Sequence, residues 1–352
     1  MTARYGPEDV ARLLELPEPT AEQAAVIAAP AQPLAVIAGA GSGKSETMAA
    51  RLVWLVANGL VRPDRVLGLT FTRKAAAELA ERVRSRLDRL RRSGLTPASQ
   101  PTEAATPPPP ADPNDPTNLP FAGDPVIGTY HAYAGRLVSD HALREGLEPS
   151  MRLITPAESW QLAARIVAAY DGPMQDIGWG PPTVTAAVLA LSGELSEHLR
   201  EPADVRAIGE WLDQRQAALG GKLPAYVKKM VQSQRAREQL LPLAAQYASE
   251  KKRREVLDHG DQMALAARIA SRHPEVGLAE RGRYQVVLLD EYQDTSHAQL
   301  VLLRALFGGG HPVTAVGDPC QSIYGWRGAS AGNLRRFSED FPVLPKTPRP
   351  GV

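Results

Sequence analysis

The 352-residue sequence contains a single cysteine, Cys320. One cysteine cannot close a disulfide within the chain, and this excludes a disulfide framework as well as any zinc or iron–sulfur site built from cysteines. An excess of one charge is lacking too, because 40 Lys and Arg residues stand against 39 Asp and Glu residues. Contact with a polyanion must therefore come from local clusters of basic residues and not from the net charge.

Long hydrophobic runs are also absent. No apolar stretch approaches the roughly 18 residues of a membrane-spanning helix, and the opening residues MTARYGPEDV are too polar and acidic for a signal peptide. We therefore expect a soluble, cytoplasmic protein with no membrane partner. Apolar residues still make up 43% of the chain, enough for a sizeable core, and the length predicts about two or three domains.

Five short apolar runs end in small or polar residues. They cover residues 34–40, 65–72, 124–130, 284–291 and 312–318. Runs of Val, Ile and Leu without alternation are typical of strands buried on both faces of a parallel sheet. Short buried helices are the weaker alternative, because Gly or Asp ends most of the runs. Helical stretches such as Lys44–Val56 and Lys74–Leu90 lie between them, so the sequence predicts a three-layer α/β sandwich.

Two segments and the end of the chain depart from this alternation of strands and helices. Residues 91–125 contain ten prolines, a composition that predicts a disordered insertion. Residues 135–255 lack strand signals and carry helical patterns, which predicts a mostly helical subdomain inserted into the α/β fold. Residues 342–352 are rich in proline and without apolar period, and we expect a disordered tail there.

A glycine-rich loop follows the first predicted strand and opens a helix. Its glycines let backbone N–H groups turn inward around phosphate oxygens, and the helix N-terminus adds a partial positive charge. Lys44 would face the β- and γ-phosphates of ATP, and Ser45 would offer its hydroxyl to Mg²⁺. A glycine turn that binds nothing is the alternative. The predicted nucleotide-binding residues are Ala38 (in place of the usual first glycine), Gly39, Ala40, Gly41, Ser42, Gly43, Lys44 and Ser45.

An acidic pair ends the apolar run 284–291. Asp290 is expected at the carboxyl end of a strand, where open α/β sheets bind ligands. It is placed to hold Mg²⁺, directly or through water, and Glu291 to orient or deprotonate an attacking water. Taken alone, an Asp-Glu pair is more often two solvated surface carboxylates. The phosphate loop in the same sequence favours the functional interpretation. The histidines show no metal-ligand spacing, so Mg²⁺ brought with ATP is the one metal we expect.

Six motifs in a fixed order resemble those of the UvrD/Rep/PcrA-type DNA helicases of superfamily 1A. They lie at residues 20–23, 38–45, 70–76, 128–132, 290–294 and 317–329. The resemblance implies a RecA-like P-loop NTPase core with a parallel sheet (domain 1A), interrupted by a helical 1B insertion. On this basis domain 1A covers residues 1–90, 126–134 and 256–341, the Pro-rich insertion 91–125, the 1B-like insertion 135–255 and the tail 342–352.

The resemblance also assigns roles to residues. Gln23 would read the adenine edge, and Gln321 would lie near the γ-phosphate and act with Lys44 and Glu291 in catalysis. Single-stranded and forked DNA would be the partners. Aromatic faces accept any base by stacking, although core packing is the alternative for each aromatic taken alone. The candidate DNA contacts are Phe71, Tyr130, Tyr324 and Trp326 for stacking and Thr72, Arg73 and His131 for the backbone.

Two further features bear on partners. Residues 72–76 and 258–262 look most like the AdnB-type subunit of bacterial helicase–nucleases, which implies a second helicase–nuclease subunit. Basic clusters at 73–92 and 222–254 would form a groove or a duplex-binding face, or else be solvated helix surfaces.

The resemblance implies ATP-dependent translocation on single-stranded DNA and unwinding, 3′ to 5′, in DNA repair or recombination. A nucleotide- and DNA-binding module without turnover is the alternative, and an unrelated P-loop kinase is a weaker one. The family's motifs IV, V and VI have no counterpart in this sequence, and its end looks truncated. We therefore expect a chain that binds ATP and DNA, turns over slowly and does not unwind.

Overall fold

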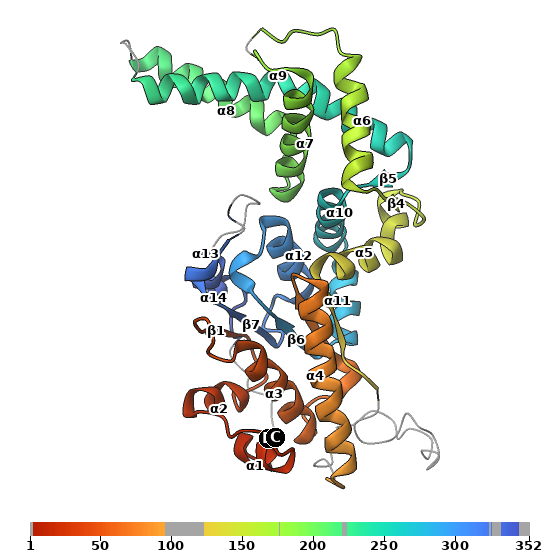
Figure 1. The fold of residues 1–352 in the computed structure, drawn as a ribbon, viewed down its shortest axis with the longest axis vertical. Helices are drawn as coiled ribbons and strands as arrows, with labels where there is room; N and C mark the ends of the chain where they lie inside the picture. The colour runs from red at the N-terminus through yellow and green to blue at the C-terminus, as the bar shows by residue number, and fades with distance from the viewer. Residues whose placement is uncertain are drawn as a thin grey trace, which may run out of the picture.

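The structure, a computed structural model, describes residues 3–95, 123–175, 177–219, 224–323, 325 and 332–344. Figure 1 shows an α/β part built around a sheet and, above it, a group of helices that leaves this part and returns to it. None of the helices in the described ranges is long and apolar enough to cross a bilayer.

All five predicted strand runs form strands of one parallel sheet, in the order β1-β7-β6-β2-β3. The strands are β1 (Leu34–Ile37), β2 (Val66–Thr70), β3 (Val126–Thr129), β6 (Val286–Leu289) and β7 (Val313–Gly317). The three inner strands are buried along their whole length, as unbroken apolar runs require. The predicted α/β class with a parallel sheet is confirmed.

Helices cover both faces of the sheet. Alternate strand residues enter two cores: Val287 and Leu289 belong to one, Val286 and Leu288 to the other. One face is covered by α1 (Pro7–Leu13), α2 (Ala21–Ile27), α3 (Lys44–Ala57) and α4 (Arg73–Arg92). The other is covered by α5 (Tyr130–His141), α10 (His259–Arg272), α11 (Pro274–Arg283), α12 (His297–Phe307), α13 (Gly332–Arg335) and α14 (Phe337–Asp340). The sandwich therefore has three layers, as expected.

The inserted segment is mainly helical and has a core of its own. It comprises α6 (Pro156–Ala168), α7 (Pro181–Glu197), α8 (Pro202–Leu219) and α9 (Ala225–Arg253). Leu162, Val188, Leu240 and Tyr247 are among the buried residues of this third core. Figure 1 shows these helices standing apart from the sheet.

The ends of the helical part differ from the predicted boundaries at 135 and 255. Helix α5 spans the first boundary, and its Leu137 is buried in the core of the α/β part. Two short strands, β4 (Arg152–Leu153) and β5 (Val256–Leu257), then pair in parallel where no strand was predicted. Strands of two residues are too short to leave an apolar run. The two strands join the segment that leaves the α/β part to the segment that returns to it.

The predicted Pro-rich insertion has ordered edges. Helix α4 continues to Arg92. Arg91 donates a hydrogen bond to the carbonyl oxygen of Gly123 at 2.8 Å, and Asp124 forms ion pairs with Arg84 and Arg91. The rest of this prediction falls on residues 96–122, which lie outside the described residues, as do residues 345–352 of the predicted tail.

Candidate functional site

The glycine-rich loop connects β1 to α3. Gly41 and Gly43 adopt φ values of +73° and +80°, which favour glycine. The Nζ of Lys44 donates to the carbonyl oxygens of Ala38 at 3.2 Å and Gly39 at 3.4 Å, so the ammonium group lies across the loop. A pocket of about 290 Å³ is lined by Gly39, Gly41, Gly43, Lys44, Ser45, Glu46 and Arg82. This cradle at a helix N-terminus suits a phosphate chain.

The acidic pair lies at the end of β6. Asp290 is 5% exposed. Burial, and next the neighbouring carboxylate of Glu291, raise the pKa of Asp290 to about 6, against the opposing effects of the Glu291 N–H and Lys44. Glu291 adopts the left-handed φ of +50°, and its carboxylate accepts a hydrogen bond from Nε2 of Gln293 at 2.7 Å. The pair is therefore held in place next to the phosphate loop.

Gln293 also connects the acidic pair to the loop after β7. Its Oε1 accepts a hydrogen bond from the backbone N–H of Asp318 at 3.0 Å. The carboxylate of Asp318 in turn accepts bonds from the backbone N–H of Cys320 and the side-chain amide of Gln321. Gln321 is thus held beside Asp318, whose pKa is lowered by these two hydrogen bonds and, more weakly, by Lys44.

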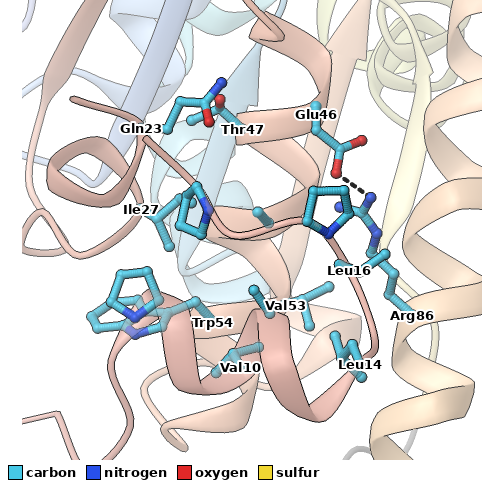
Figure 2. A pocket seen from close by; sticks show the side chains of 15 residues that line it. Val10, Leu14, Leu16, Gln23, Ile27, Glu46, Thr47, Val53, Trp54 and Arg86 are labelled. Atoms are coloured by element: carbon cyan, nitrogen blue, oxygen red, sulfur yellow. Dashed lines mark hydrogen bonds and ion pairs between the residues drawn. The ribbon is translucent and has the colours of Figure 1, made fainter. Parts of the chain in front are cut away.

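Gln23 lies against the phosphate loop. Its Nε2 donates to the carbonyl oxygen of Ser42 and its Oε1 accepts from the backbone N–H of Thr20, both at 3.0 Å. Figure 2 shows Gln23 and Thr47 at one end of a pocket, with the Glu46–Arg86 ion pair on its other side. The walls between them are apolar, with Val10, Leu14, Ile27, Val53 and Trp54 among the lining residues.

Ser45 and Asp290 offer oxygen atoms of the kind that bind Mg²⁺. Ser45 lies in the first turn of α3 and offers a hydroxyl, and Asp290 offers a carboxylate. These are the hard oxygen ligands that Mg²⁺ prefers. The buried charge of Asp290 beside Glu291 is also one that a divalent cation would offset.

A groove of about 840 Å³ lies between the α/β part and the helical part. Three of the predicted DNA contacts line it: Phe71, Arg73 and His131. Thr72 is exposed between the first two, and its Oγ1 caps α4 by accepting a hydrogen bond from the N–H of Ala75 at 3.0 Å. Tyr324 and Trp326 lie outside the described residues.

Tyr130 does not reach this groove, contrary to its predicted stacking role. It is 2% exposed and lies in the core beneath Phe71, with the ring centroids 4.8 Å apart. Its hydroxyl donates to the carbonyl oxygen of Asp290 at 3.4 Å. As the first residue of α5, Tyr130 points into the core and supports residues of both the groove and the acidic pair.

The groove contains residues that the sequence did not single out as DNA contacts. His259 and Gln262 enter it from α10, and the ring of His259 meets that of His131 edge-on with centroids 5.4 Å apart. Glu194 and Glu197 enter it from α7. Asp258, whose side chain caps α10, marks this helix start in the sequence, but which side chains face the groove depends on the fold.

Several residues of the basic clusters form ion pairs instead of lining the groove. Arg84 pairs with Glu81 and Asp124, Arg235 with Asp213 and Glu238, and Lys251 with Asp258 and Asp261. Among the residues of the two clusters that the structure describes, Arg73 is the one that lines the groove. Arg84 and Arg235 are therefore charges on the surfaces of their helices, whereas Lys251 is buried.

Comparisons with known proteins agree with the motifs. The chain matches the family model of the UvrD/REP helicase N-terminal domain over residues 19–342. It is 28% identical to DNA helicase II of Escherichia coli over 321 residues, which cover 91% of this chain and 36% of that protein. It is 29% identical to a probable DNA helicase II homolog of Rickettsia felis over 317 residues, which cover 88% and 38%.

The ATP-dependent DNA helicase PcrA of Staphylococcus aureus is 27% identical over 325 residues, which cover 91% of this chain and 36% of PcrA. The chain therefore spans little more than a third of the length of these relatives. The family match includes all six motifs and nearly the whole sheet-forming part. The chain belongs to the UvrD/REP helicase family, and its α/β part is the RecA-like core of the N-terminal domain of that family.

Proposed function

We propose that the chain binds ATP with Mg²⁺ at the phosphate loop and single-stranded DNA in the groove between its two parts. The observation that supports this pairing most directly is the contact between the sites. Phe71 lines the groove and packs on Tyr130, and Tyr130 donates to the backbone of Asp290. A base bound at Phe71 would therefore be separated from the acidic pair by one side chain, that of Tyr130.

In this proposal each residue of the nucleotide site has one task. Lys44 neutralises the β- and γ-phosphates, and Ser45 and Asp290 hold Mg²⁺, which supplies positive charge to the phosphate oxygens when bound. Glu291 orients the attacking water and accepts its proton. Gln321, held by Asp318, lies near the γ-phosphate. Phe71, Thr72, Arg73 and His131 hold the strand, and Gln23 reads the base.

The activity of a complete helicase is the wider proposal. By its family, the protein would move 3′ to 5′ on DNA in repair or recombination in the cytoplasm, with forked DNA as substrate and a second helicase–nuclease subunit as partner. For the 352-residue chain alone we propose slow turnover and no unwinding. Lys44 and Arg82 are the cations lining the phosphate pocket, and Arg82 is within 3.6 Å of Glu46. An additional arginine that contacts the γ-phosphate, an arginine finger, can raise the rate of hydrolysis about 10³- to 10⁵-fold.

Steady-state ATP hydrolysis by the purified chain, with and without single-stranded DNA, tests this function. We expect a low rate that rises with DNA, and Lys44→Ala should abolish it. Lys228→Ala, on the exposed surface of α9, is the matched control and should behave as the wild type. Turnover insensitive to DNA would favour a P-loop kinase, and ATP binding without turnover would favour a binding module. Robust strand displacement by the chain alone would contradict the absence of unwinding.

A further inference from the structure

Arg51 is a buried cation on α3 with no contact to the phosphate pocket. It is 1% exposed, and burial lowers the pKa of its guanidinium to about 10. Its guanidinium donates five hydrogen bonds, which account for all three of its nitrogen atoms. The acceptors are the carbonyl oxygens of Val26, Ile27, Ala29 and Pro30 and the Oγ1 of Thr314.

Four of these acceptors lie at the end of one short helix or just after it. Helix α2 covers only Ala21–Ile27, and the carbonyls bonded to Arg51 belong to its last turn and the turn that follows. A helix of seven residues is marginal on its own. A cation at its C-terminus satisfies the free carbonyls and complements the helix dipole. Arg51 therefore fixes α2 against α3 and, through Thr314, against β7.

The opposite end of α2 carries Gln23. A glutamine amide has two N–H donors and an oxygen with two lone pairs. The contacts to Ser42 and Thr20 use one donor and one lone pair. One donor and one lone pair remain, which is the pattern that matches N7 and the N6 amino group of adenine. Guanine presents an oxygen in place of the amino group, so the same amide would not match it.

We propose that Arg51 is a positioning residue for base recognition: it holds α2 so that the remaining donor and lone pair of Gln23 select adenine over guanine. This inference rests on the proposed nucleotide site. It differs from a merely structural role in one testable way: the effect of replacing Arg51 on base preference must depend on the presence of Gln23.

The test is the ratio of ATP to GTP affinity, measured by titration of the purified chain. We expect the wild type to prefer ATP, and Gln23→Ala to lower this preference about tenfold, the equivalent of about 1.4 kcal/mol. Arg51→Lys keeps the charge but cannot reach all five acceptors, and it should lower the preference to a similar extent. In a Gln23→Ala background, Arg51→Lys should change the ratio no further. Arg89→Lys is the control, because the guanidinium of Arg89 also donates to a carbonyl oxygen at a helix end, that of Leu14 after α1 instead of α2.

Circular dichroism and thermal melting identify the variants that fold, and Arg51→Gln replaces Arg51→Lys if the latter does not. A folded Arg51 variant with the wild-type ATP to GTP ratio would overturn the inference. So would an equal loss of preference in Arg89→Lys, or an additive effect of Arg51→Lys and Gln23→Ala. A wild-type chain that binds ATP and GTP equally refutes the base-reading role but leaves the phosphate site intact. Failure to bind either nucleotide refutes the proposed function itself.

Discussion

At the scale of single residues, Asp290 carries an electrostatic cost in the folded protein. Its carboxylate is 5% exposed and lies beside Glu291, and burial followed by this repulsion raises its pKa to about 6. Such a charge is unfavourable for folding at neutral pH, because the unfolded chain ionises the same group without the penalty. A residue that destabilises the apo protein is expected where a cation is to be bound.

Replacing Asp290 by Asn should therefore separate stability from function. We expect Asp290→Asn to raise the free energy of unfolding at neutral pH by about 1–3 kcal/mol, and to remove the dependence of ATP affinity on Mg²⁺. Urea denaturation and ATP titration with and without Mg²⁺ measure the two effects. Asp124→Asn, an exposed carboxylate paired with Arg84 and Arg91, is the control. An unchanged Mg²⁺ dependence would contradict the metal role of Asp290.

His311 predicts a separate pH dependence of stability. Burial, and next the charge of Arg281, lower its pKa from 6.5 to about 4, and its ring stacks on Phe307. As the pH falls from 6.5 towards 4, the unfolded chain binds a proton that the folded chain does not, so stability is lost over this window. In His311→Phe the melting temperature should fall less steeply between about pH 7 and about pH 4.5. Equal slopes would show that His311 titrates normally.

At this scale the position of the phosphate loop could be predicted from the sequence, but the burial of Tyr130 could not. Residues 38–45 are contiguous, and their chemistry depends on local backbone shape and on one lysine. The burial of Tyr130 depends on Phe71 and on Asp290, which is 160 residues away in sequence. A motif shows that an aromatic belongs to a region but does not show which side of the helix faces solvent.

At the scale of elements, the helical part is fastened to the α/β part by a buried lysine. Lys251, near the end of α9, donates to Asp258 at 2.6 Å and pairs with Asp261 at 2.5 Å, at the N-terminus of α10. The Lys251 side chain is 4% exposed, and its ammonium lies 4.4 Å from the centroid of the Tyr247 ring. Burial alone would lower the pKa of Lys251, but the two carboxylates raise it above the ordinary value.

Lys251→Met should destabilise the chain by about 3 kcal/mol, because it leaves two largely buried carboxylates without their cation. Thermal melting and urea denaturation measure this loss. Lys252→Met, which alters the exposed neighbour on the same helix, should have little effect. If both variants melt alike, the buried triad does not fasten the two parts.

The elements themselves were predicted from local pattern, but their limits were not. Apolar runs gave all five strands of the sheet, because strands buried on both faces need such runs. The strand pair β4–β5 and the extent of α5 depend on pairing across about a hundred residues of intervening chain. Those contacts leave no local signal.

At the scale of the whole molecule, the groove between the two parts has mixed charge. Arg73, His131 and His259 line the groove in which we place DNA, together with Glu194 and Glu197. Acidic side chains in such a groove repel phosphates, which weakens binding but keeps the strand movable.

Glu194→Gln should therefore raise the affinity for single-stranded DNA about two- to fivefold at low salt, and the difference should shrink as salt screens the charge. Fluorescence anisotropy with a labelled oligonucleotide measures it over a salt series. Glu238→Gln, on α9 and paired with Arg235, is the control outside the groove. An unchanged or reduced affinity in Glu194→Gln would place the strand elsewhere.

The strand order has a consequence for how the protein forms during its synthesis. In the described sheet β1 pairs with β7 alone, and β7 ends at Gly317. The strand that precedes the phosphate loop therefore has no neighbour in this sheet until the residues up to Gly317 have left the ribosome. The helical part, whose core is complete by Tyr247, can fold earlier. In the proposed function, nucleotide can stabilise the phosphate loop only after β1 has paired with β7, and the nascent chain must keep an unpaired strand from aggregating until then.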